Sequence, residues 1–419
     1  AKEVMNELKV RASYGVLGNL NGIGNYATQS TVTSGLNNIQ GSSLWEGAIT
    51  GEKWTSLSTV TWEKTKTFNI GLDMALWNSK LTIGADYFIQ KTEDMLLGMP
   101  QPGSFGLSGS PTLNAGTVEN KGLELVINHR NNVGEVYYHI GANATFLKNE
   151  LTKVNGDRDE WTGFNPHGKG AITYAKTGYP IGFFNLIKSD GIFQSEEEIR
   201  AYVDKNGNMI QPKAQPGDLK FVDYNGDGQI NDLDRQDCGS SFPKVTLGLN
   251  LGAEWRGLDA NLFFDSSLGH KIYNAQYYTT VYNEVTGNQY AERLNSWTEN
   301  NRNTDIPRYV KGTDDNGTNW AYIDRWLESG SFFRLKTLEV GYTLPKAWVN
   351  KAKLQNVRIY TAMENLFTIT SYKGYTPDLG TVDADGAGTS GGSGVLTRGC
   401  DDGRYPSART MTFGLQVNF

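Results

Sequence analysis

The feature of this sequence that most constrains its fold is a strict alternation of apolar and polar residues. Apolar side chains take every second position from Phe68 to Leu76, with Asn69, Gly71 and Asp73 between them. The same period returns near 81–87, 123–128, 245–254, 258–264, 338–342 and 357–363. A period of two is that of a β-strand with one apolar face. Several runs reach about ten residues, where five or six is usual. We therefore predict an all-β fold of long antiparallel strands.

The C-terminus carries the same pattern. Residues 411–419 (MTFGLQVNF) alternate in polarity and place Phe419 at the last position. A terminal segment frays unless it is tied into a sheet. In an outer-membrane barrel the last strand has that role, and its terminal aromatic lies in the interfacial girdle. An ordinary edge strand of a soluble domain is the alternative that this segment alone leaves open.

Composition permits a barrel and excludes other classes. The sequence contains no run of 18 or more apolar residues, the mark of a membrane-spanning helix. Its hydrophobic fraction is 38% and its mean hydropathy is −0.47. A barrel gives such values because only every second strand residue faces lipid and the loops are polar. The net charge of −6 offers no basic face for nucleic acid.

The chain has two cysteines, Cys238 and Cys400, both in predicted loops. Two cysteines in 419 residues exclude a disulfide scaffold or a cysteine-rich metal site. One bridge between them remains an open alternative in an oxidising compartment.

The lengths of the connections predict an orientation. Tight turns at 78–79, 131–133 and 256–257 alternate with long polar stretches at 17–60, 96–118, 149–242, 271–330 and 371–407. Outer-membrane barrels have short periplasmic turns and long extracellular loops. From a first strand near 6–16, about ten strands keep this order, and Phe419 falls on the short-turn side. We predict the wall of an antiparallel transmembrane β-barrel in a Gram-negative outer membrane.

Small helices are expected within the connections. Ser195 and Glu198 have the spacing of a capping box. Residues 288–299 carry Tyr290, Leu294 and Trp297 at helical spacing, and 345–354 are expected to form a longer turn with a helical piece. We interpret the first two as braces within the large external loops rather than as sites.

The clearest chemical motif lies in the long loop at about 190–240, at residues 223–234 (DYNGDGQINDLD). Oxygen-bearing side chains at positions 1, 3 and 5, glycine at 6 and a carboxylate at 12 match the spacing of an EF-hand calcium loop. Gly228 permits the sharp turn, and Asn231 is placed to hold a water. The predicted calcium ligands are Asp223, Asn225, Asp227, Gln229 through its backbone carbonyl, and Asp234. Asp234 is one carbon shorter than the usual glutamate, so bidentate binding is less assured. A polar turn without an ion is the alternative.

Further motifs together resemble a known family. In chain order they are 216–221 (PGDLKF) before the calcium-like loop, 241–250 (SFPKVTLGLN), 328–336 (ESGSFFRLK), 341–345 (GYTLP), 364–367 (ENLF) and the terminal strand. This series is similar to the C-terminal part of SusC/RagA-type TonB-dependent transporters of Bacteroidetes, and the resemblance covers nearly the whole chain.

The resemblance implies a 22-stranded barrel around a plug, of which residues 1–419 would form the C-terminal part. No TonB box, plug or N-terminal domain is found in the chain, which we expect to be a fragment or one piece of a split transporter. The implied activity is TonB-dependent import of oligosaccharides or oligopeptides with a SusD-like surface lipoprotein as lid. The implied partners are that lipoprotein, the TonB complex through the missing part, the remainder of the barrel and outer-membrane lipid. Calcium would be structural, and no nucleic acid is expected.

Two other functions are weighed against import. A complete ten-stranded barrel, acting as a protease or an adhesin, would need no further strands. The protease would require histidine and carboxylates at the external rim, and only His270, with Asp265 nearby, is suitably placed among His129, His139, His167 and His270. A secreted calcium-binding β module would leave the long apolar stripes unexplained. The sequence predicts no catalytic residue and leaves the substrate-binding residues unassigned.

Overall fold

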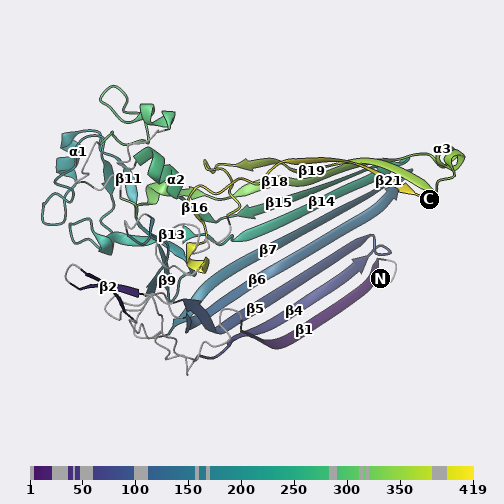
Figure 1. Ribbon diagram of the computed structural model, residues 1–419, viewed down its shortest axis with the longest axis horizontal. Helices are drawn as coiled ribbons and strands as arrows, with labels where there is room; N and C mark the ends of the chain where they lie inside the picture. Colours follow the sequence, from purple (N-terminus) through teal and green to yellow (C-terminus); the bar gives the residue numbers. More distant parts are fainter. Residues whose placement is uncertain are drawn as a thin grey trace.

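The long strands form one antiparallel sheet. The computed structural model describes residues 4–20, 36–40, 43–47, 60–98, 112–155, 160–166, 170–282, 290–310, 316, 320–379 and 394–419. The sheet has ten strands in sequence order: β1 (Met5–Asn19), β4 (Glu63–Leu76), β5 (Leu81–Gly98), β6 (Thr112–Val133), β7 (Val136–Val154), β14 (Val245–Trp255), β15 (Leu258–Leu268), β18 (Phe332–Thr343), β19 (Asn356–Thr370) and β21 (Thr410–Asn418). They curve into a trough (Figure 1). The prediction of about ten antiparallel strands is confirmed.

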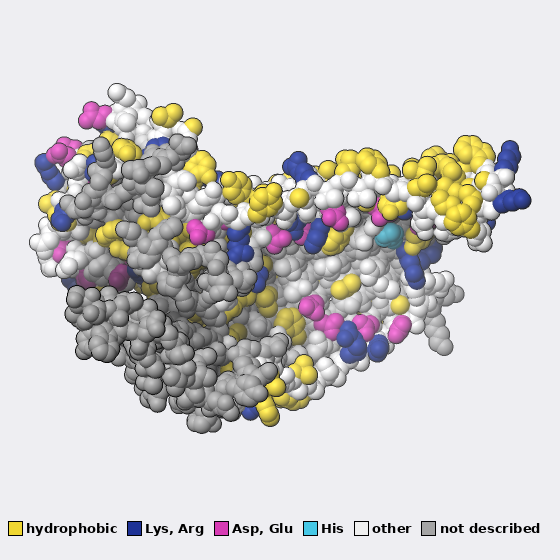
Figure 2. Space-filling model, viewed as in Figure 1, with side chains coloured by type: hydrophobic (Ala, Val, Ile, Leu, Met, Phe, Trp, Pro, Cys, Tyr) yellow, Lys and Arg dark blue, Asp and Glu magenta, His cyan; other side chains and the backbone are white. Residues whose placement is uncertain are grey.

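The sheet register sorts side chains onto two faces. Phe68 of β4 is opposite Ile89 of β5, and Gly71 is opposite Asp86. Apolar residues therefore share the outer face, where Ile70 is 45% and Leu415 is 65% exposed. Acidic and basic side chains gather in the hollow of the sheet (Figure 2). The apolar stripe lies open on the outside, as lipid contact requires, and is not buried against a second sheet.

Short turns lie at one end of the trough and long connections at the other (Figure 1). The turn after β4 holds Trp77, Asn78 and Ser79 at positive φ. Arg256 and Gly257, at φ 48° and 87°, join β14 to β15. The turn after β4 has four residues, 77–80, whereas that at 256–257 is a two-residue hairpin, which needs this left-handed backbone because it matches the strand twist. The longer turn after β18 contains α3 (Lys346–Val349), as expected.

The sheet is open. In the described chain β1 pairs with β4 alone and β21 with β19 alone. These two strands are the edges, so the ten strands are a wall and not a closed cylinder. This topology corrects the alternative of a complete ten-stranded barrel.

The long connections are more folded than the sequence indicated. They contain a four-stranded sheet, β13-β10-β9-β8, a pair β11-β12 and a three-stranded sheet β17-β16-β20. Their bounds are β8 (Glu160–Thr162), β9 (Thr173–Lys176), β10 (Phe183–Ile187), β11 (Ser189–Ile192), β12 (Leu219–Phe221), β13 (Arg235–Ser240), β16 (Lys271–Asn274), β17 (Leu327–Ser329) and β20 (Cys400–Asp401). A further hairpin joins β2 (Leu36–Gln40) to β3 (Ser43–Gly47). We call the part built from β8–β13, β16, β17 and β20 the loop assembly.

The loop assembly has an apolar core of its own. Phe184, Leu186, Phe221, Tyr273 and Trp326 are fully buried there. A second cluster, with Val118 and Leu151 from the sheet and Trp161 from β8, joins the assembly to the long-loop end of β6 and β7. The burial needed to order the loops thus comes from short apolar runs within them.

Two expectations about local structure are resolved. Ser195 caps α1 (Glu196–Ala201), and its hydroxyl accepts the N–H of Glu198, which confirms that helix. The helix expected at 288–299 is wrong: the chain there forms a 3₁₀ turn at Ala291–Asn295, and 288–289 lie outside the described residues. Strands β5 and β6 also extend into the predicted loop 96–118.

The described residues contain no helix with the length and apolar character needed to cross a membrane.

Candidate functional site: the inner face of the sheet and the loop 223–234

The inner face is a polar wall held by cross-strand ion pairs. Arg11 of β1 donates to Asp73 of β4 through Nε (2.7 Å) and to Asp86 of β5 through Nη2 (2.8 Å). Alternation places these residues on one face, and antiparallel pairing brings them together across three strands. Such charges are solvated in a water-filled lumen, whereas lipid would not tolerate them.

Other arginines repeat the arrangement at the far side of the sheet. Arg358 of β19 contacts Asp259 and Glu339. Its guanidinium lies over Gly341, where a Cβ would fall 2.5 Å from the guanidinium nitrogens. Glycine therefore lets this long side chain lie flat along the wall. The lumen keeps its width while the wall stays charged.

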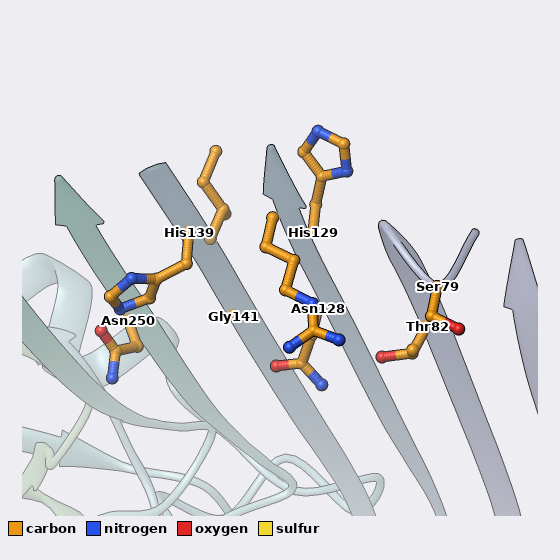
Figure 3. A pocket seen from close by; sticks show the side chains of 9 residues that line it. Ser79, Thr82, Asn128, His129, His139, Gly141 and Asn250 are labelled. Carbon is orange, nitrogen blue, oxygen red and sulfur yellow. The ribbon is translucent and has the colours of Figure 1, made fainter. Parts of the chain in front are cut away.

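A pocket of about 360 Å³ lies on this face near the short turns (Figure 3). It is lined by side chains of β5, β6, β7 and β14: Thr82, Asn128, Arg130, His139 and Asn250 are among them. Arg130 is paired in register with His139. The pocket thus offers hydrogen-bond donors and acceptors to whatever occupies the lumen at that level.

The histidine and carboxylate of the protease alternative do not come together. Asp265 is bound by Arg334 through two hydrogen bonds of 2.9 and 2.6 Å. His270 is buried, and its Nε2 lies 3.5 Å from the carbonyl of Pro377. Burial lowers the pKa of His270. Asp265 is thus engaged by Arg334 and does not orient this imidazole. His167 lies outside the described residues.

The loop 223–234 is wrapped around its own carboxylates. Asp223 accepts the backbone N–H of Gly226 at 2.7 Å and of Gly228 at 2.9 Å. Asn225 accepts the N–H of Asp227, and Asp227 accepts the N–H of Gln229, both at 2.9 Å. The side-chain amide of Asn225 and then the N–H of Gln229 lower the pKa of Asp227.

Asp234 closes the loop from inside. Its side chain is fully buried and accepts the N–H of Tyr224 at 2.9 Å and of Asn231 at 2.7 Å. The structure therefore brings Asp223, Asn225 and Asp227 onto one turn, while both oxygens of Asp234 are occupied by backbone amides. Within the described ranges, no group of three or more His, Cys, Asp or Glu side chains is gathered as metal ligands.

The two cysteines are free thiols, so the open alternative of a bridge is not realised. Burial raises the pKa of Cys238 to about 12 and raises that of Cys400 as well. Several aromatic side chains of the long connections are packed in the loop assembly. Trp161, Phe164 and Tyr278 are each at most 5% exposed.

We compared the sequence and the fold with those of known proteins. No family model matches the chain. The TonB-dependent receptor P3 of Formosa agariphila is 31% identical over 414 residues, 98% of this chain and 39% of the relative. The TonB-dependent receptor SusC of Bacteroides thetaiotaomicron is 26% identical over 365 residues, 85% of this chain and 32% of the relative.

A solved structure of the RagAB peptide transporter is similar along the whole chain. It gives a TM-score of 0.74 at 26% identity and covers 100% of this chain and 41% of that one. The chain thus spans roughly two fifths of the length of several of the proteins it matches. Together with the lipid-facing stripe, these likenesses show that the strands lie in an outer membrane. In sequence and fold the chain matches a barrel portion of SusC/RagA-type TonB-dependent outer-membrane proteins.

Proposed function

We propose that this chain forms part of the wall of a transporter that imports oligosaccharides or oligopeptides with a SusD-like surface lipoprotein as lid. The observation that carries the proposal is the combination of a polar, ion-paired inner face with an exposed apolar outer face. A wall of this kind separates lipid from an aqueous path. The folded loop assembly at one end of that path supplies a surface on which a lid can close.

The proposed mechanism is binding followed by gated passage, without covalent chemistry. Substrate is held between the loop assembly and the lid, and a plug driven by the TonB complex then releases it inward. In this chain the wall residues keep the passage hydrated, and the glycines under Arg358 and His139 keep it wide. The plug and the remaining strands belong to the rest of the transporter.

The substrate class is tested by uptake. A strain lacking the gene is offered fluorescent oligopeptides and oligosaccharides, with and without a protonophore that removes the energy for TonB. We expect uptake of one class to fall to background in the mutant, to return on complementation and to require the membrane energy. RagAB, named as a peptide transporter, makes oligopeptides the first panel. Unchanged uptake of every compound in both panels would contradict the proposal.

We also propose that the loop 223–234 binds calcium as a structural ion. Its support is the spacing of Asp223, Asn225 and Asp227 and the way their side chains already cap the amides of one tight turn. These three side chains and the carbonyl of Gln229 would hold the ion, with Asn231 placed to carry a water. Asp234 would need to release a backbone amide before it could join them.

A further inference from the structure

The outer face carries a compact group of charges just beyond the apolar stripe. On β4 the outward positions run Leu76, Met74, Leu72, Ile70 and Phe68 from the short-turn end and then change to Lys66 and Lys64. The same change occurs on β5 after Ile89, on β6 after Leu123 and on β7 after Phe146. We call this group the lysine belt. It consists of Lys64, Lys66, Lys91, Glu93, Glu119, Lys121, Lys148 and Glu150.

The register aligns the belt across four neighbouring strands. Lys66 is opposite Lys91, Lys91 is opposite Glu119, and Glu119 is opposite Glu150. In the next outward row toward the short turns, Lys121 is opposite Lys148. Adjacent strands lie about 4.8 Å apart, so the belt is roughly 15 Å wide. That is the scale of one lipid headgroup rather than of a protein interface.

Ion pairs hold the belt in place without neutralising it. Glu93 accepts from Lys66 at 2.7 Å and from Lys91 at 3.4 Å. Lys148 pairs with Glu150 at 2.8 Å and remains 65% exposed. Five lysines face three glutamates in the belt, and Asp94 lies near Lys66, so a positive excess remains. Each paired ammonium has more donors than the one its glutamate accepts, because a lysine carries three.

The height of the belt in the membrane follows from the apolar run below it. Five outward residues on β4, from Leu76 to Phe68, span about 27 Å of strand at roughly 3.4 Å per residue. Tilted by about 40°, such a run fits the apolar band of an outer-membrane barrel, about 25 Å tall. The belt lies on the long-loop side of this band, at the level of the outer-leaflet headgroups.

We propose that the lysine belt binds the phosphate-bearing headgroup of an outer-leaflet glycolipid. Ammonium groups bind phosphate oxygens strongly, and basic residues beside an anionic lipid surface are attracted to it. On neighbouring β14 the outward positions end at Val245 and are followed by Pro243, while Lys244 between them has the opposite parity. The belt is therefore a local site for one lipid and not a continuous girdle.

The test uses the complete transporter in mild detergent with EDTA, so that divalent cations cannot bridge phosphate to glutamate. Purified lipopolysaccharide, its dephosphorylated form and inorganic phosphate are added, and bound lipid is measured by native mass spectrometry. We expect the phosphorylated glycolipid to bind and to raise Tm. Equal binding of the dephosphorylated form, or an equal effect of inorganic phosphate, would overturn the proposal.

Paired variants separate lipid binding from a structural role. Lys66→Gln with Lys91→Gln should lower the affinity about 25-fold, taking about fivefold for each basic residue near an anionic surface. Lys346→Gln with Lys351→Gln, two exposed lysines at the short-turn end, is the matched control and should bind like the wild type. Glu93→Gln frees two lysines and should strengthen binding. A folded, heat-modifiable lysine variant that retains wild-type affinity would overturn the proposal, as would weaker binding by Glu93→Gln.

Discussion

At the scale of single residues, the loop assembly depends on buried polar groups that are individually satisfied. Asp218 is fully buried, and its carboxylate is bound by Arg308 at Nε and Nη2 and by the N–H of Gln215. A buried carboxylate is stable only with such partners. Asp190, in the same assembly, is 71% exposed and has a single contact to Lys220 at 3.5 Å. The two ion-paired aspartates therefore contribute very differently to the stability of the loop assembly.

Replacing Asp218 should therefore loosen the loop assembly while leaving the sheet intact. We expect Asp218→Ala to destabilise it by about 3 kcal/mol, since removing one partner of a buried pair leaves the other uncompensated. Asp190→Ala should cost under about 0.5 kcal/mol. Hydrogen exchange of the amides at 183–222 measures the difference. Equal exchange rates in the two variants would contradict the larger stabilising role of Asp218.

The free thiols give a second prediction at this scale. The thiolate is the reactive form of cysteine, and burial raises the pKa of Cys238 to about 12. At pH 8 both thiols should be protonated and should resist maleimide in the folded protein. After denaturation, mass spectrometry should find two labels. Rapid labelling of the folded protein, or a mass showing a bridge, would contradict the structure.

At the scale of elements, the sequence was most informative where the membrane imposes a pattern. The alternation in β4, β14 and β19 arises because one face meets lipid and the other water, so their positions were predictable. No such rule acts in the loops. The strand β10 (Phe183–Ile187, FFNLI) is buried on both sides, and so short an apolar run does not distinguish a strand from a buried helix.

The helix expected at 288–299 failed for a related reason. Of its three apolar residues only Trp297 is buried, while Tyr290 and Leu294 are 45% and 91% exposed, so the stripe is packed at one end only. An isolated helix of this length is marginal in water without packing. At residues 223–234 the spacing predicted one turn built by Asp223, Asn225 and Asp227. It could not show that Asp234 is held by the amides of Tyr224 and Asn231, because that depends on the three-dimensional fold of the loop.

The calcium proposal is tested on this element. Removal of divalent ions with EDTA should make residues 190–240 sensitive to limited proteolysis, because the carboxylates of a tight turn then repel one another. The strands should stay protected. Asp223→Ala with Asp227→Ala should abolish calcium binding in a calorimetric titration. Asp232→Ala is the control in the same loop, since its carboxylate pairs with Arg235. Unchanged proteolysis after EDTA would count against the ion.

At the scale of the whole molecule, the strand order and the connections define two sides. Gly134 lies in a short turn, and Tyr405 lies at the long-loop end, where it is 92% exposed. If the short turns are periplasmic, a cysteine at Tyr405 should react with an impermeant maleimide in intact cells. A cysteine at Gly134 should react only after the outer membrane is permeabilised. The opposite pattern would invert the proposed direction of import.

The two free edges of the sheet require partner strands from the rest of the protein. β1 and β21 present rows of N–H and C=O groups that are paired on one side only in the described chain. Each such group in hydrocarbon costs several kcal/mol, so an open edge does not persist in a bilayer. Expressed alone, residues 1–419 should fail to give a heat-modifiable, protease-resistant band in outer membranes. The same strands within the complete transporter should give one. A stable inserted band from the chain alone would require β1 and β21 to find each other or a second copy, and cross-linking between cysteines placed at Val10 and Phe413 would then identify the closure.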